Sequence, residues 1–128
     1  MSQQVKVSGL EDLVATLREH GHDVRAGLEM VGRSGAEVLR AEMSKRAPVR
    51  TGYLREHIGI GDAKIDEAKG QITIPVGPNN KAFYGLFQEF GTRHHPAQPF
   101  MRPAADESQA QVLAAAKAAA KKLIEGIA

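Results

Sequence analysis

The sequence predicts an α+β fold in which long helices pack on a small antiparallel sheet. Helical apolar spacing in the first third, two stretches of alternating apolar residues in the middle and an Ala-rich C-terminal third predict it. The predicted order is helix, helix, strand, strand, helix, helix. The 128 residues suit one domain, which we expect to span residues 1–128.

The first two predicted helices occupy residues 8–46. Ser8 to Glu11 fits a capping box, after which apolar residues recur at helical spacing as far as Gly21. The second helix is predicted from about His22 to Arg46, ending before Pro48. It contains three glycines, which indicate close packing or a bend: Gly27, Gly32 and Gly35.

Two strands are predicted next, over Leu54–Ile60 and Gln71–Val76. The polar connection between them is expected to be an exposed turn. Pro75 cannot donate a backbone hydrogen bond, so we expect the second strand to lie at an edge or to end there.

The last third of the chain is predicted to hold two helices. Aromatic residues at helical steps predict a short helix over Lys81–Phe90, with Gly91 as its C-cap. Thr92–Pro103 contains three prolines and is expected to be an extended arm. The final helix is predicted over Ala104–Ile127, with Pro103 in its first turn.

Five of the six aromatic residues lie between positions 83 and 100. The four in the short helix are expected to be core. Phe100 follows Pro99 on the irregular arm, together with Met101 and Arg102. Aromatic, Met and Arg side chains are enriched at interface cores, so the arm is either an anchor within the subunit or a contact with a neighbouring copy.

Composition and charge exclude some classes of protein and leave others open. The absence of Cys excludes a disulfide framework and a thiolate zinc site. The longest apolar run, Val112–Ala116, is too short for a membrane span, and Met1–Val7 has no signal-peptide core. A basic stretch at 45–55, with Lys45, Arg46, Arg50 and Arg55, keeps nucleic-acid binding as an alternative, secondary role.

Candidate catalytic and metal-binding residues are few. Adjacent His94 and His95 would point apart in an extended chain and lack a metal-ligand pattern. Glu89 lies among apolar residues, where an ion pair with Arg93 or Arg102 is favoured over a catalytic role. We therefore predict no enzyme activity, no metal and no cofactor.

Three motifs follow one another in a fixed order along the chain. They are Pro48-Val49-Arg50-Thr51-Gly52-Tyr53-Leu54-Arg55, then Tyr84 through Glu89-Phe90-Gly91-Thr92, then Gln98-Pro99-Phe100 through Pro103-Ala104. In this order they resemble the small tail-component family of tailed bacteriophages, typified by the tail component of the Hong Kong 97 lambdoid phage. The resemblance covers about residues 10–125.

The resemblance implies a structural virion protein of the neck or tail-completion type, a kind not known as enzymes. Such a subunit would join the head connector to the tail as a homo-oligomeric ring. Its partners would be other virion proteins, such as the connector or stopper, the tail terminator or the tail tube. It would be assembled in the host cytoplasm without a membrane. The interface candidates are Arg50, Thr51, Gly52, Tyr84, Glu89, Phe90, Gly91, Thr92, Pro99, Phe100, Arg102 and Pro103.

Overall fold

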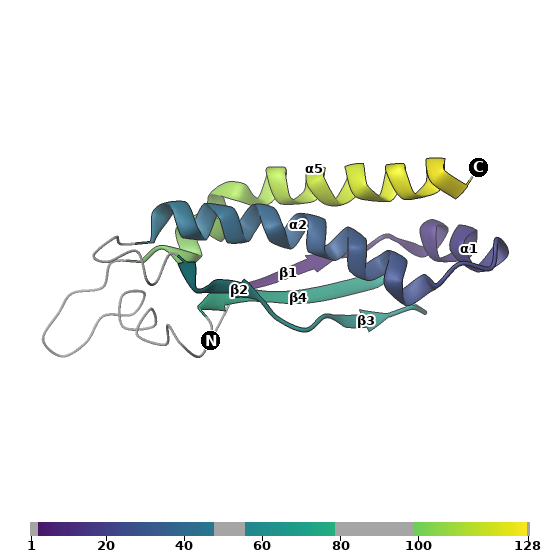
Figure 1. The fold of residues 1–128 in the computed structure, drawn as a ribbon, viewed down its shortest axis with the longest axis horizontal. Coiled ribbons are helices and arrows are strands. Elements are labelled where there is room, and N and C mark those ends of the chain that lie inside the picture. The colour runs from purple at the N-terminus through teal and green to yellow at the C-terminus, as the bar shows by residue number, and fades with distance from the viewer. Residues whose placement is uncertain (1–2, 48–55, 79–98, 128) are drawn as a thin grey trace, which may run out of the picture.

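The computed structural model describes residues 3–47, 56–78 and 99–127, which form one antiparallel sheet and three helices (Figure 1). Helix α2 packs on one face of the sheet and α5 runs alongside α2, whereas the shorter α1 lies at the end of the layer (Figure 1). The elements, in chain order, are β1 (Gln3–Val7), α1 (Glu11–Glu19), α2 (Val24–Arg46), β2 (Ile58–Ile60), β3 (Lys64–Asp66), β4 (Gln71–Pro78) and α5 (Met101–Ile127).

This architecture confirms the α+β class and corrects the predicted order. Within residues 3–47, 56–78 and 99–127, a strand comes first, three strands lie between α2 and α5, and α5 is the last element. The predicted short helix over Lys81–Phe90 lies outside the described residues. The final helix was predicted from Ala104; it starts at Met101, with Pro103 in its first turn as expected.

Strand β1 was missed because its segment reads as a polar terminus. Val5 and Val7 alternate with Gln4 and Lys6, and only the two valines are buried. They pair with Ile74 and Ile72 of β4. A five-residue segment with only two apolar residues is too short to predict a strand from the sequence. Its alternation of apolar and polar residues indicates a strand only once its pairing with β4 is known.

Helix α1 begins at Glu11, and the predicted capping box is wrong. Its N-cap is Leu10, and no side chain caps it. Gly9 has a positive φ of 76°, which turns the chain sharply out of β1. The Leu10 N–H instead donates to the Gly70 carbonyl at 3.1 Å. A backbone hydrogen bond to the β3–β4 turn therefore holds the start of α1, where the sequence had predicted a side-chain cap.

Gly70 is the residue that allows this contact. Its φ is +59°, and a Cβ there would lie 2.5 Å from the Glu11 backbone nitrogen and 2.7 Å from the Leu10 carbonyl carbon. The polar connection expected to be an exposed turn therefore contains a third strand, β3, and a turn that docks on the start of α1.

Helix α2 runs close to its predicted limits, and its glycines confirm the expected close packing. Asp23 caps it by accepting from the Ala26 N–H at 3.1 Å. A Cβ at Gly32 would lie 2.6 Å from the Ile72 Cδ1 of β4. At Gly35 it would lie 3.1 Å from the Val112 carbonyl oxygen of α5. The two glycines let α2 approach the sheet on one side and α5 on the other.

The central strand of the described sheet is β4, which corrects the prediction that Pro75 marks an edge. Strand β1 pairs on one side of β4, and β2 and β3 pair on the other. The Pro75 carbonyl accepts from the Gly61 N–H at 2.8 Å, and Gly61 lies in the gap between β2 and β3. Pro75 is tolerated because its missing N–H falls where the ladder is already interrupted.

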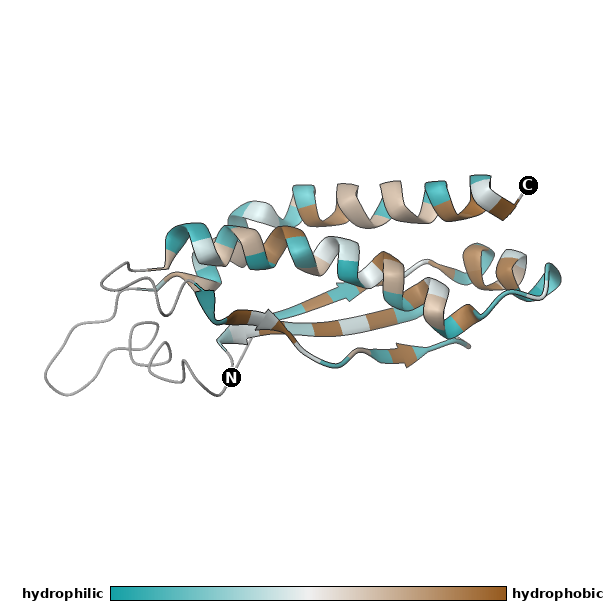
Figure 2. Ribbon diagram, in the orientation of Figure 1, coloured by the Kyte–Doolittle hydropathy of each residue, from teal (hydrophilic) through white to brown (hydrophobic). Residues whose placement is uncertain are grey.

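The core lies between the sheet and the two long helices. Apolar residues alternate along β4 (Figure 2), and Ile72, Ile74 and Val76 are fully buried. Helix α2 contributes Leu28, Val31, Leu39 and Met43 from the opposite side. Helix α5 contributes small residues, chiefly Ala104 and Ala116, which lets it lie close to α2.

Candidate interaction surfaces

Phe100 belongs to the core of its own subunit. Its side chain is 1% exposed, as is that of Met101, and both belong to the main apolar cluster. The expectation that Phe100 anchors a neighbouring copy is therefore not met, because the ring has no free surface to offer. At the described end of the arm, α5 begins directly after Phe100, and the Ala104 N–H donates to the Phe100 carbonyl at 3.2 Å.

The neighbours of Phe100 are the other described interface candidates. Pro99 and Arg102 are exposed and Pro103 is half-buried, and all three lie within three residues of Phe100 in the sequence. The remaining candidates lie outside the described residues, so nothing here tests them: Arg50, Thr51, Gly52, Tyr84, Glu89, Phe90, Gly91 and Thr92.

One arginine of the basic stretch, Arg46, is already paired. The Arg46 guanidinium donates to Glu42, one turn earlier in α2, at 3.1 Å, and also to Glu107 of α5. The hydrogen bonds to Glu107 and Glu42 raise the pKa of Arg46 above its ordinary value. Arg46 therefore ties the end of α2 to the start of α5, which weakens its candidacy for binding phosphate. Arg50 and Arg55 lie outside the described residues.

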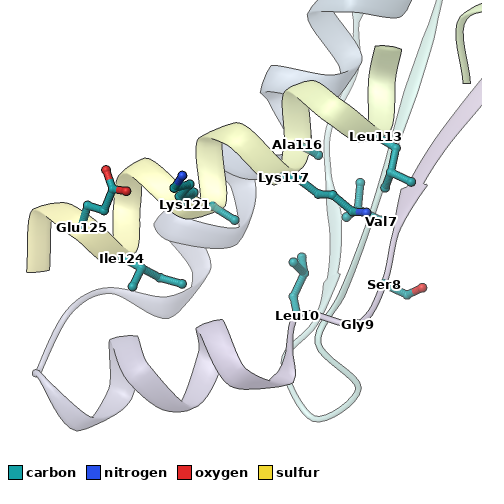
Figure 3. A pocket seen from close by; sticks show the side chains of 11 residues that line it. Val7, Ser8, Gly9, Leu10, Leu113, Ala116, Lys117, Lys121, Ile124 and Glu125 are labelled. Carbon is teal, nitrogen blue, oxygen red and sulfur yellow. The ribbon is translucent and has the colours of Figure 1, made fainter. Parts of the chain in front are cut away.

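A cleft of about 520 Å³ lies between α5 and the connection from β1 to α1. One wall is formed by residues 7–10 and the other by α5 from Leu113 to Glu125. Figure 3 shows Leu10 pointing toward α5 and Ile124 pointing toward the opposite wall. Lys117 and Lys121 stand on the α5 wall, so this surface, the α5 cleft, is apolar inside with basic groups along it.

A second surface, the Met30 strip, lies on the outer face of α2. It is a shallow depression lined by Ala26, Glu29, Met30, Arg33, Ser34, Glu37 and Ile60. Met30 is 46% exposed at its centre. Both acidic groups are paired with arginines of α2: Glu29 accepts from Arg33 at 2.9 Å, and the hydrogen bonds from Arg40 hold the pKa of Glu37 below its ordinary value.

Sequence reasoning missed both surfaces. The signal was present in α5, where Leu113, Lys117, Ala120 and Ile124 form a stripe beside the one that packs on α2. In an Ala-rich helix the stripe that lines the cleft cannot be told from the stripe that packs on α2 by sequence alone, because alanine occurs in both. Met30 gave no signal, since a single exposed methionine is common on helix surfaces.

The described residues contain no cluster of side chains that could hold a metal ion. Within residues 3–47, 56–78 and 99–127, no three His, Cys, Asp or Glu side chains lie close enough to hold a metal ion. The His20 ring contacts the Thr16 carbonyl at 3.0 Å, which makes it part of the end of α1. No helix in this part of the chain is long and apolar enough to cross a membrane.

A comparison with protein families bears on identity directly. The sequence profile of a family described as bacteriophage HK97-gp10, putative tail-component, matches residues 11–91. The chain belongs to the HK97-gp10 family. The match runs from the start of α1 through the sheet to Gly91. The family is one of phage tail components, which implies a place in the virion.

The HK97-gp10 match is shorter than the resemblance expected over residues 10–125. It includes the first motif and the second as far as Gly91, and stops before the Gln98–Ala104 motif and α5. No curated protein and no solved structure matches the chain. The α5 cleft is therefore built by elements on both sides of the matched region, since residues 7–10 precede it and α5 follows it.

Proposed function

We propose that this HK97-gp10 family member is a structural subunit of the neck or tail-completion type. It forms a homo-oligomeric ring that joins the head connector to the tail and contacts other virion proteins. The tail-component family membership supports this function most strongly. The three motifs in family order support it as well, because the third extends the likeness beyond the matched residues.

The fold suits a role that consists of contacts rather than chemistry. Two long helices are fixed on a sheet by glycine-mediated approaches, which gives a rigid body with extended faces. The apolar surface that remains lies on the helices, in the α5 cleft and on the Met30 strip. We take residues 1–128 as one domain that acts by binding, without a cofactor, after assembly in the host cytoplasm.

Deletion of the gene from the phage that encodes the chain tests this function. Particles from the deletion strain, viewed by electron microscopy, should be full heads and separate tails, since the joining subunit is missing. Supplying the full chain from a plasmid should restore joined particles. Normal numbers of joined, infectious particles without the chain would overturn the proposal.

A further inference from the structure

The exposed apolar side chains of the described residues are concentrated on two surfaces. Three large hydrophobic side chains are exposed in this part of the chain: Met30 at 46%, Leu113 at 46% and Ile124 at 40%. Leu113 and Ile124 line the α5 cleft, and Met30 is the centre of the Met30 strip. A contact that buries these three side chains would remove from water the largest exposed apolar groups of this part of the chain.

The two surfaces differ in which charged groups they offer. The α5 cleft is lined by two lysines, Lys117 and Lys121, and one acid, Glu125. The Met30 strip is lined by two acids, Glu29 and Glu37, each already paired with an arginine of α2, Arg33 and Arg40. Two clefts facing each other would bring lysines together, whereas a cleft facing a strip places its lysines beside carboxylates that can accept further hydrogen bonds.

The two surfaces also lie over opposite edges of the sheet. Val7 of β1 forms part of the α5 cleft, and Ile60 of β2 forms part of the Met30 strip. In the sheet order, β1 and β2 lie on opposite sides of β4. When the cleft of one copy binds the strip of a second, the first copy still has a free strip and the second a free cleft. Further copies can therefore add at both ends of the pair. Repetition of such a head-to-tail contact produces a ring if the rotation closes.

We propose that the α5 cleft receives the Met30 strip of a second copy of this chain. Met30 enters the apolar space between Leu113 and Ile124, while Lys117 and Lys121 face Glu29 and Glu37 of the incoming copy. The inference rests on the proposed ring, and names the surfaces that build it.

Two full-length variants test the contact by removing apolar character without adding charge. The cleft variant combines Leu113→Gln with Ile124→Gln, and the strip variant is Met30→Gln. Exposed alanines on the same helices, outside both surfaces, give the controls Ala118→Gln and Ala41→Gln. Sedimentation from about 1 μM to about 1 mM measures self-association, and thermal unfolding confirms that each variant is folded.

The wild-type chain and both controls should associate beyond a dimer, and each surface variant should associate at least about tenfold more weakly. An equal mixture of the two variants should form dimers and nothing larger. One intact strip then meets one intact cleft, and both outer surfaces are defective. Charge reversal by Lys117→Glu with Lys121→Glu should weaken association too, and these exposed side chains can change without affecting the core.

Three outcomes would overturn the contact: a wild-type chain that stays monomeric over this range, surface variants that associate like the wild type, or a strip variant that associates normally while the cleft variant does not. The last would mean that the cleft meets a different surface. These results are separable from the proposed function, which fails only if phage lacking the chain still join heads to tails.

Discussion

Phe100 illustrates how the sequence can single out a residue and still leave two roles open for it. Its position between two prolines, followed by Met and Arg, made a contact with a neighbour as plausible as a place in the core. The structure buries it within the subunit. The sequence cannot make this choice, because both environments exclude water equally and only the path of the arm decides between them.

Replacement of this ring gives a direct prediction. Phe100→Ala should lower the free energy of unfolding by about 3–5 kcal/mol, since a fully buried aromatic side chain is removed and a cavity remains. Denaturant unfolding of the monomer measures it. Gln111→Ala, at an exposed position of the same helix, should change stability by less than about 0.5 kcal/mol. Equal, small effects of both changes would show that Phe100 is not core.

A second residue-scale prediction concerns the Glu37 carboxyl group. Its hydrogen bonds to Arg40 lower its pKa, so the pair stabilises the fold above the unfolded-state pKa of Glu37, and this is lost as the pH falls through the folded-state value. In Arg40→Gln the pKa of Glu37 should rise toward its ordinary value, as followed by NMR titration of the side-chain carboxyl. The Glu37 side chain is exposed and that of Arg40 is half-buried, so solvent screens the pair and the effect on stability is small. An unchanged pKa would show that the pair does not form in solution.

At the scale of elements, the long and strongly patterned segments were predictable. Helix α2, α5 and the apolar face of β4 follow from apolar spacing, Ala-rich composition and the positions of Pro48 and Pro103. The short strands β1 and β3 were not, because strands of five and three residues gain their stability from pairing with β4. The sequence also could not predict that Pro75 lies in the central strand. Its missing N–H is tolerated there because β2 and β3 are interrupted at Gly61, which lies beside Pro75.

The glycine contacts between α2 and α5 give the element-scale prediction. Gly35→Leu should lower the free energy of unfolding by about 2–3 kcal/mol, because its side chain would collide with Val112 and push α5 away. Ala41→Leu places the same side chain on an exposed position of α2 and should change stability by less than about 0.5 kcal/mol. Thermal or denaturant unfolding of both variants decides. A stable Gly35→Leu protein would mean that α5 does not lie this close to α2.

At the scale of the whole molecule, the family could be recognised from motifs, and the family match confirms it. The candidate contact surfaces could not be found this way. The α5 cleft needs residues 7–10 and 113–125 to come together, which only the fold reveals. Eight of the twelve interface candidates predicted from the sequence lie outside the described residues and stay predictions, whereas Phe100 is buried in its own subunit.

A reconstruction of the neck of the intact virion by electron cryomicroscopy tests the central claim most directly. We predict a ring of copies of this fold at the head–tail junction, with α5 of each copy against α2 of the next. Absence of the chain from that junction, with the position filled by another fold, would contradict the account.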